Sequence, residues 1–185
     1  MPNCDIDFGK WNKLDAALGA VDCEVVNLNG LGLNELPPQL FEMVNLRKLD
    51  ASTNNLKALP AELGALKQLE VLNLNKNKLT ALGPVIGEFT NLKELILGHY
   101  FGGGQANLTT LPPEIGKLTK LKELWACGLS ITHIPPEIAL LKDNLEKLFL
   151  YADDGDYIHS NPICGNPEEL DKLRAWLPNT MIVYK

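Results

Sequence analysis

The chain has 185 residues, of which 45% are hydrophobic and 22% are charged, and its formal net charge is −6. This length fits a single domain or one short repeat array. The acidic balance argues against a nucleic-acid-binding protein, which needs a basic face. No apolar run approaches the length of a membrane span, and no polybasic segment would hold the chain at an anionic lipid surface.

The first residues, MPNCDIDFGKW, lack the basic and apolar regions of a secretory signal. Residues 1–22 instead predict a helical cap, because Phe8, Trp11, Leu14 and Leu18 recur at helical spacing. An array of repeats needs such a cap, since an exposed terminal repeat leaves a strip of the core in water. Trp11 is therefore expected in the core of the cap.

The cysteines predict neither a metal site nor a disulfide framework. Cys4, Cys23, Cys127 and Cys164 form no C-x-x-C pair, and no histidine lies at the spacing of a zinc ligand. We therefore expect free thiols, a reducing cytoplasmic compartment, and no metal or other cofactor. Two long-range disulfides stay open as the alternative.

From residue 23 onward the chain repeats every 23 residues. The segment Leu46-x-x-Leu49-x-Ala51-x-x-Asn54-x-Leu56 aligns with Leu69-x-x-Leu72-x-Leu74-x-x-Asn77-x-Leu79, and successive units start at residues 23, 46, 69, 92, 121 and 145. Apolar residues at positions 4 and 6 of each unit alternate, so they point to one side of a short strand. Only a neighbouring unit can cover that side, which predicts stacked units with a parallel sheet and a continuous core.

This pattern, L-x-x-L-x-L-x-x-N-x-L-x-x-L-P, resembles the leucine-rich repeat family over about residues 23–165. The steps Leu111-Pro-Pro-Glu-Ile115-Gly and Ile134-Pro-Pro-Glu-Ile138 are similar to the 23-residue subclass of intracellular Ras-group scaffolds. The resemblance implies an α/β fold: a right-handed solenoid with a parallel sheet on its concave face, helical or 3-10 turns on its convex face, and helical caps at both ends. It further implies a single domain over residues 1–185, with about six repeats at 23–165, that binds a protein on its concave face. Small GTPases, phosphatases and kinases are the partners that the resemblance suggests.

Two features interrupt the regular pattern. The asparagine at position 9 closes the turn after each strand, where its amide can bond main-chain groups. Asn54 and Asn77 fit this place, whereas other units carry Leu31, Leu129 and Asp153 there. Gly83-Pro84 replaces the Leu-Pro step of the third unit, which predicts a local change on the convex side.

The fourth unit spans 29 residues instead of 23, because of an insertion at residues 98–107 with the sequence GHYFGGGQAN. Its three consecutive glycines permit positive φ and a free bend, and three aromatic or imidazole side chains precede them. We expect a recognition loop or lid that adds these side chains to the rim of the concave face. The alternative is a neutral insertion, which surface loops tolerate at low cost.

The concave face changes character along the array. By register, its solvent-facing strand positions are short and polar in the first three units and large and apolar in the last three. Aromatic side chains clustered outside a core are typical of interface hot spots. The predicted partner-binding residues are Ile96, His99, Tyr100, Phe101, Trp125, Phe149 and Tyr151, with Cys127 on the same face. The alternative is that the inserted loop covers them without any partner.

Residues 166–185 predict a second helical cap. Asn166-Pro167-Glu168-Glu169 fits a helix N-terminus with an asparagine N-cap, proline at the first position and glutamate at the third. An apolar stripe then follows at helical spacing: Leu170, Leu173, Trp176 and Leu177.

No group of residues predicts catalysis, so we do not expect an enzyme. The three histidines fall in different units, which keeps them apart: His99, His133 and His159. An acidic turn at Asp153, Asp154 and Asp156 lacks the spacing and the closing glutamate of an EF-hand calcium loop. Asn107-Leu108-Thr109 is a glycosylation sequon, which matters only in a secreted protein.

The sequence thus predicts a cytoplasmic, non-catalytic signalling scaffold that binds a protein partner on the C-terminal half of its concave face. Two alternatives stay open. One is a self-associating structural module, in which two aromatic patches bury each other to form a homo-oligomer. The other is a secreted or effector-type receptor for a peptide or glycan. Neither nucleic acid nor a membrane is an expected partner.

Overall fold

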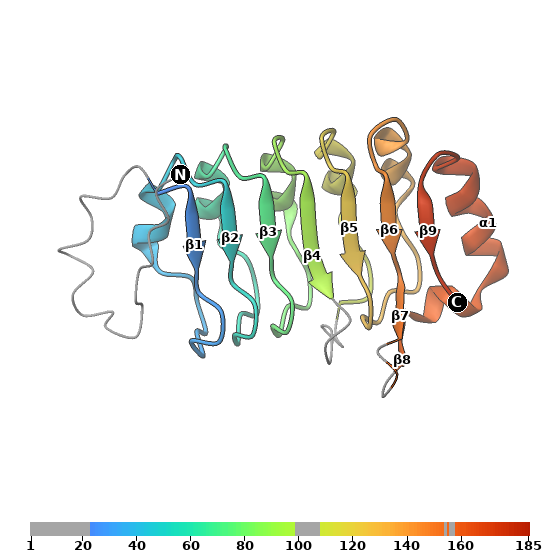
Figure 1. Cartoon of the computed structure of the whole chain (residues 1–185), viewed down its shortest axis with the longest axis horizontal. Helices are drawn as coiled ribbons and strands as arrows, with labels where there is room; N and C mark the ends of the chain where they lie inside the picture. Colours follow the sequence, from blue (N-terminus) through green and yellow to red (C-terminus); the bar gives the residue numbers. More distant parts are fainter. Residues whose placement is uncertain (1–22, 99–107, 154, 156–157) are drawn as a thin grey trace.

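The computed structural model describes residues 23–98, 108–153, 155 and 158–185. Within these residues the chain forms a seven-stranded sheet in the order β1-β2-β3-β4-β5-β6-β9, with every neighbouring pair parallel. Figure 1 shows the strands side by side along the long axis of the molecule. They are β1 (Val25–Asn27), β2 (Lys48–Asp50), β3 (Val71–Asn73), β4 (Glu94–Gly98), β5 (Glu123–Ala126), β6 (Lys147–Phe149) and β9 (Met181–Val183).

Short 3-10 helices form the layer opposite the sheet. They are η2 (Pro38–Glu42), η3 (Ala61–Ala65), η4 (Pro84–Glu88), η5 (Pro113–Lys117) and η6 (Pro136–Leu141). A further 3-10 helix, η7 (Pro162–Gly165), contacts the C-terminal helix at residues 167–176. Most of them follow a proline pair or a Leu-Pro step, because proline fixes φ near the value that a helical first turn needs. One side of the sheet faces these 3-10 helices, and we call the other, outward side the strand face. It corresponds to the concave face of the sequence prediction.

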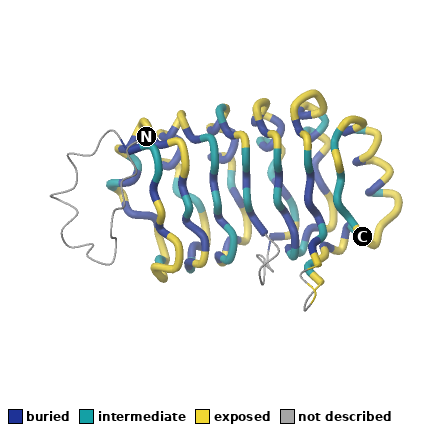
Figure 2. The backbone as a smooth tube through the Cα atoms, in the orientation of Figure 1, coloured by how far each residue is buried: buried dark blue, intermediate teal, exposed yellow. Residues whose placement is uncertain are grey.

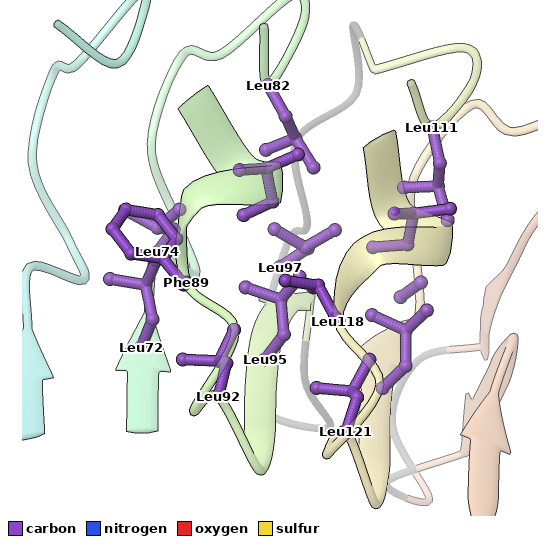
Figure 3. Packing of buried hydrophobic residues seen from close by; sticks show 14 of the residues in the cluster. Leu72, Leu74, Leu82, Phe89, Leu92, Leu95, Leu97, Leu111, Leu118 and Leu121 are labelled. Atoms are coloured by element: carbon purple, nitrogen blue, oxygen red, sulfur yellow. The ribbon is translucent and has the colours of Figure 1, made fainter. Parts of the chain in front are cut away.

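The core lies between these two layers. The position-4 leucines of successive strands pair in register, for example Leu49 with Leu72 and Leu72 with Leu95, and all three are at most 1% exposed. Figure 3 shows Leu95 and Leu97 pointing into the layer that also holds Phe89 and Leu118, and Figure 2 shows buried positions recurring in every unit. Each buried leucine contributes about 1.5–3 kcal/mol. The predicted solenoid with a parallel sheet and 3-10 turns is confirmed.

The predicted asparagine ladder joins neighbouring units. Nδ2 of Asn77 donates to Leu74 O in its own unit and to Ala51 O in the preceding unit, both at 2.9 Å. Its Oδ1 accepts from the N–H of Leu56 at 3.1 Å. Asn54 makes the corresponding bonds one unit earlier. A buried amide therefore satisfies main-chain groups that the turn leaves without strand partners.

Asn161, and not Asp153, makes this set of bonds in the last unit. Nδ2 of Asn161 donates to Ala126 O at 2.6 Å and to Leu150 O at 2.8 Å, and Oδ1 accepts from Ile131 N–H at 3.1 Å. The residues between form an antiparallel hairpin of β7 (Tyr151–Asp153) and β8 (Ile158–Ser160). Assigning Asp153 to position 9 was wrong, because this hairpin delays the asparagine by eight positions, from 153 to 161.

The Gly83-Pro84 step changes the convex side as predicted. Gly83 has φ +69°, whereas Pro60 before η3 has φ −71°. The first hydrogen bond of η4, from Ile86 N–H to Gly83 O, is 3.5 Å long, compared with 3.2 Å from Leu63 N–H to Pro60 O. The first turn of η4 is therefore looser than that of η3.

The C-terminal cap is a helix followed by a strand. Helix α1 (Pro167–Trp176) begins as predicted, with the Asn166 side chain accepting from Glu169 N–H, and it buries Leu170 and Leu173. The chain then returns to the sheet as β9, which pairs with β6 and was not predicted. The N-terminal cap predicted at residues 1–22 lies outside the described residues. Neither α1 nor any other described helix has the length and apolar character to cross a membrane.

Candidate functional site

The unusual sequence after Leu97 begins with a glycine that the packing requires. β4 extends to Gly98, and its pairing with β5 shifts register between Ile96 and Gly98. A Cβ atom at Gly98 would lie 1.9 Å from the carbonyl oxygen of Cys127, so only glycine allows this approach of the two backbones. His99, Tyr100 and Phe101 lie outside the described residues, and their role in recognition stays a prediction.

An apolar row crosses the strand face at the C-terminal end of the array. Ile96 pairs in register with Trp125, Trp125 with Phe149, and Phe149 with Val183 of β9. The rings of Trp125 and Phe149 are stacked, with centroids 3.7 Å apart and planes 11° from parallel. Trp125, Phe149, Val183, Cys127 and Ala152 form a cluster separate from the main core, which we call the strand-face cluster.

The strand-face cluster is more enclosed than the sequence predicts. Phe149 is only 7% exposed, whereas Trp125, Val183 and the neighbouring Ile96 are half-buried. Phe149 is covered because Trp125 stacks on one side and the unforeseen strand β9 adds Val183 on the other. Among the described residues of this row, the surface that a partner could reach is therefore formed mainly by Trp125, Ile96 and Val183.

Tyr151 belongs to the hairpin and does not join this row. Ala152 packs in the strand-face cluster, and because neighbours on a strand point to opposite sides, Tyr151 points away from it. Its hydroxyl donates to Asp153 Oδ2 at 3.3 Å. Tyr151 instead lines a cavity of about 480 Å³ with Ile158 and Lys185. The sequence signal for this hairpin was that the asparagine and the apolar residue two positions later, Asn161 and Ile163, come eight residues after the places that the repeat assigns to them.

The sequence predicts Cys127 on the exposed strand face, but in the structure it is fully buried. Its Sγ donates to the carbonyl oxygen of Tyr151 at 3.4 Å. Burial raises the pKa of the Cys127 thiol to about 12, and the nearby Cys164 adds to the rise. The reactive thiolate is therefore absent near neutral pH.

The expectation that every cysteine is a free thiol is wrong for Cys23, which is disulfide-bonded. Cys127 and Cys164 are free, and Cys4 lies outside the described residues. The spacing of the cysteines could not reveal this bond, because the pairing of cysteines cannot be deduced from sequence alone.

A row of charged residues runs next to the apolar row. Glu94, Glu123 and Lys147 are register partners on β4, β5 and β6. Glu123 accepts from Lys147 Nζ at 2.8 Å and from the indole Nε1 of Trp125 at 3.2 Å. Burial and the charge of Glu123 raise the pKa of Glu94, although Lys48 and Lys147 oppose the rise.

The described residues contain no group of three or more histidine, cysteine, aspartate or glutamate side chains arranged to hold a metal ion. In the acidic turn, Asp153 accepts from the N–H of Gly155 at 2.9 Å, as in a simple turn. The His133 ring lies within hydrogen-bond distance of the hydroxyls of Thr110 and Thr132. Both contacts of the His133 ring are exposed to solvent.

The chain is similar in sequence and structure to leucine-rich repeat proteins. A family model described as Leucine Rich repeats (2 copies) matches residues 44–87. Among solved structures, a leucine-rich repeat protein of Leptospira interrogans is 32% identical, with a TM-score of 0.73 over 91% of this chain and 38% of that one. The leucine-rich repeat domain of the type III effector XopL is also 32% identical, with a TM-score of 0.60 over 77% of this chain and 43% of that one.

A third similar structure is the leucine-rich repeat ectodomain of the plant membrane receptor kinase GASSHO1/SCHENGEN3 from Arabidopsis thaliana, in complex with CASPARIAN STRIP INTEGRITY FACTOR 2. It is 30% identical, with a TM-score of 0.56 over 78% of this chain and 16% of that one. This chain therefore spans less than half the length of each of the three structures. No curated protein matches its sequence.

Proposed function

We propose that this chain, which is a leucine-rich repeat protein, recognises a protein partner without catalysis, through the C-terminal half of its strand face. The fold is in general a protein-interaction module. The observation that carries the finer proposal is the strand-face cluster, an apolar group outside the main core in which Trp125 and Val183 stay half-buried. Apolar side chains gathered beyond a core usually mark an interaction site.

Trp125 is the expected anchor of this surface. Its ring is held by the stack on Phe149 and by the bond from its Nε1 to Glu123, so it loses little side-chain freedom when a partner binds. A tryptophan buried at the centre of an interface contributes about 2 kcal/mol or more, which is about thirty-fold in Kd. Ile96 would extend the contact toward β4, where the predicted residues His99, Tyr100 and Phe101 follow.

One of the similar structures supports a role in binding a partner. The Arabidopsis ectodomain was solved with a bound factor, which is a property of that protein. By resemblance, a small GTPase, a phosphatase or a kinase would suit the same surface, and no residue here selects among them.

The test compares wild type with Trp125→Ala in partner capture from the source cells, followed by affinity measurement with the purified partner. Leu140→Ala is the matched control, because Leu140 is an exposed apolar residue, 65% accessible, on the opposite layer in η6. We expect Trp125→Ala to weaken binding about thirty-fold and Leu140→Ala to leave it unchanged, once melting curves show that both variants are folded. Equal binding by the wild type and Trp125→Ala would refute the proposal.

The same variant separates recognition from self-association. If the strand-face clusters of two copies bury each other, the mass in solution will exceed the 20.4 kDa of one chain, and Trp125→Ala will return it to that value. A wild type that stays at one chain mass leaves the surface open to a different protein.

The disulfide at Cys23 favours a second candidate, a secreted or effector-type receptor for a peptide or glycan. A cytoplasmic location would require this bond to be reduced in the native protein. Alkylation of denatured protein from its own source, before and after reduction, distinguishes the two. The receptor candidate predicts fewer alkylated cysteines before reduction than afterwards, whereas four in both samples would eliminate it.

A further inference from the structure

Glu94 is a half-buried carboxylate beside the apolar row, and it has no hydrogen-bond or ion-pair partner among the described residues. It lies two residues before Ile96 on β4, so both side chains are on the strand face. Its register partner on β5 is another carboxylate, Glu123, on a strand about 5 Å away.

The basic residues of the same row do not satisfy Glu94. Lys147 is committed to Glu123, with Nζ to Oε1 at 2.8 Å. Lys48 is two strands away from Glu94, with Val71 between them. Both oxygens of Glu123 are bonded, since Oε2 accepts from the Trp125 indole. Among the described residues, Glu94 is therefore a carboxylate next to the apolar row with no cation at contact distance.

We infer that the partner presents a basic side chain, arginine or lysine, to Glu94, next to an apolar group that packs on Ile96 and Trp125. This inference rests on the proposed function, because it concerns the chemistry of the same surface. A carboxylate that has lost part of its water without gaining a partner gains a charge-assisted hydrogen bond when a cation arrives. The apolar stem of lysine or arginine can lie along Ile96 while its charged end reaches Glu94.

Two further features agree with a basic partner. Burial and the charge of Glu123 raise the pKa of Glu94, and a cation at contact distance would remove this electrostatic cost. The formal net charge of −6 attracts basic segments over distances beyond contact. Complementary charge of this kind selects partners and speeds encounter more than it adds affinity.

The test is a selection of short random peptides displayed on phage, which identifies the recognised chemistry without a known partner. The immobilised full chain is used as wild type, Glu94→Gln, Trp125→Ala and Glu62→Gln. Glu62 is an exposed carboxylate of η3, in the layer opposite the strand face, so Glu62→Gln makes the same change in net charge away from the site. Glu94→Gln removes a destabilising charge, so melting curves should show that it folds at least as stably as wild type.

We expect wild type and Glu62→Gln to enrich peptides with arginine or lysine next to a large apolar residue. Glu94→Gln should keep the apolar preference and lose the basic one. A selected peptide should bind Glu94→Gln about 3–10-fold more weakly than wild type, with a smaller difference at high salt.

Two results would overturn different parts of the argument. Equal enrichment of basic residues by Glu94→Gln overturns the inference and leaves the proposed function standing. Peptides that bind Trp125→Ala as well as wild type, or a selection that enriches no peptide, overturn the proposed function and the inference with it.

Discussion

Replacing Asn161 by alanine tests whether the last unit of the solenoid is closed by this residue. The side chain is 2% exposed and joins two units through three hydrogen bonds. Asp153→Ala is the matched control, because Asp153 has the position that the 23-residue period assigns to the ladder. In the structure Asp153 is exposed, and among the described residues its carboxylate accepts from Gly155 N–H and the Tyr151 hydroxyl, both in its own hairpin.

The cost of Asn161→Ala follows from the groups that lose their partners. The N–H of Ile131 now donates to Oδ1 at 3.1 Å, and leaving it buried and unpaired costs about 1–3 kcal/mol. The carbonyl oxygens of Ala126 and Leu150 lose bonds of 2.6 and 2.8 Å, each worth about 1 kcal/mol net. The expected loss is therefore about 3–5 kcal/mol, a large part of the stability of a typical domain. Asp153→Ala should cost less than about 1 kcal/mol, since its bonds are exposed to water.

The measurement is urea unfolding followed by circular dichroism, with the free energy taken from the midpoint at unchanged slope. Binding assays are unnecessary, because the prediction concerns the fold alone. If Asn161→Ala costs no more than Asp153→Ala, the ladder does not pass through Asn161 and the position of the hairpin in the repeat is wrong.

Three further predictions use the same unfolding and labelling assays. Gly98→Ala should lower the free energy of unfolding by about 2–4 kcal/mol, because its Cβ would lie 1.9 Å from the Cys127 carbonyl oxygen. The control Gly165→Ala, whose Cβ would have no atom within 4 Å, should change it by less than about 0.5 kcal/mol. Equal effects of the two substitutions would contradict the close approach. Burial and the charge of Glu123 raise the pKa of Glu94, so the folded state binds the carboxyl proton more tightly than the unfolded chain does. Stability therefore falls as the pH rises from the pKa of Glu94 in the unfolded chain to its higher pKa in the folded state. Glu94→Gln should therefore add up to about 1 kcal/mol at neutral pH and nothing at acidic pH, where the carboxyl is protonated in both states; a constant gain would argue against the raised pKa. The Cys127 thiol, with a pKa of about 12, should resist iodoacetamide in native protein at mildly alkaline pH and react in urea, so rapid native labelling would show that it is accessible.

Much of the fold was predictable because the repeat is local and periodic. Leucines such as Leu72 and Leu95 recur at the same place in successive short strands, and each unit must cover the next, so the parallel sheet follows from the pattern. Asn77 was predictable for the same reason. The helix after Asn166 was predictable because its capping residues are adjacent in sequence.

The candidate site was predictable only in part. The register assigns Trp125 and Phe149 to one row on the strand face, and the structure brings them into a stack. The exposure of Phe149 was not predictable, because it depends on Val183 in a strand that reaches the sheet only after a helix. β9 itself has three residues, too few for a clear strand pattern, and it exists because the open edge of β6 supplies its hydrogen bonds.

What the sequence determined by itself is the side of the sheet to which the strand residues of the regular units point. Periods of two along a strand and 23 along the chain are enough to assign Ile96 and Glu94 to the outward side. Only the tertiary structure decided which outward residues stay accessible, because insertions and the terminal strand place distant residues beside them. The hairpin hides Cys127, β9 encloses Phe149, and the pairing of Glu123 with Lys147 leaves Glu94 without a cation. Covering a side chain or satisfying a charge depends on neighbours in space. The hairpin and β9 come from outside the regular repeat, and which charges pair along the face is decided by side-chain contacts that the period does not specify.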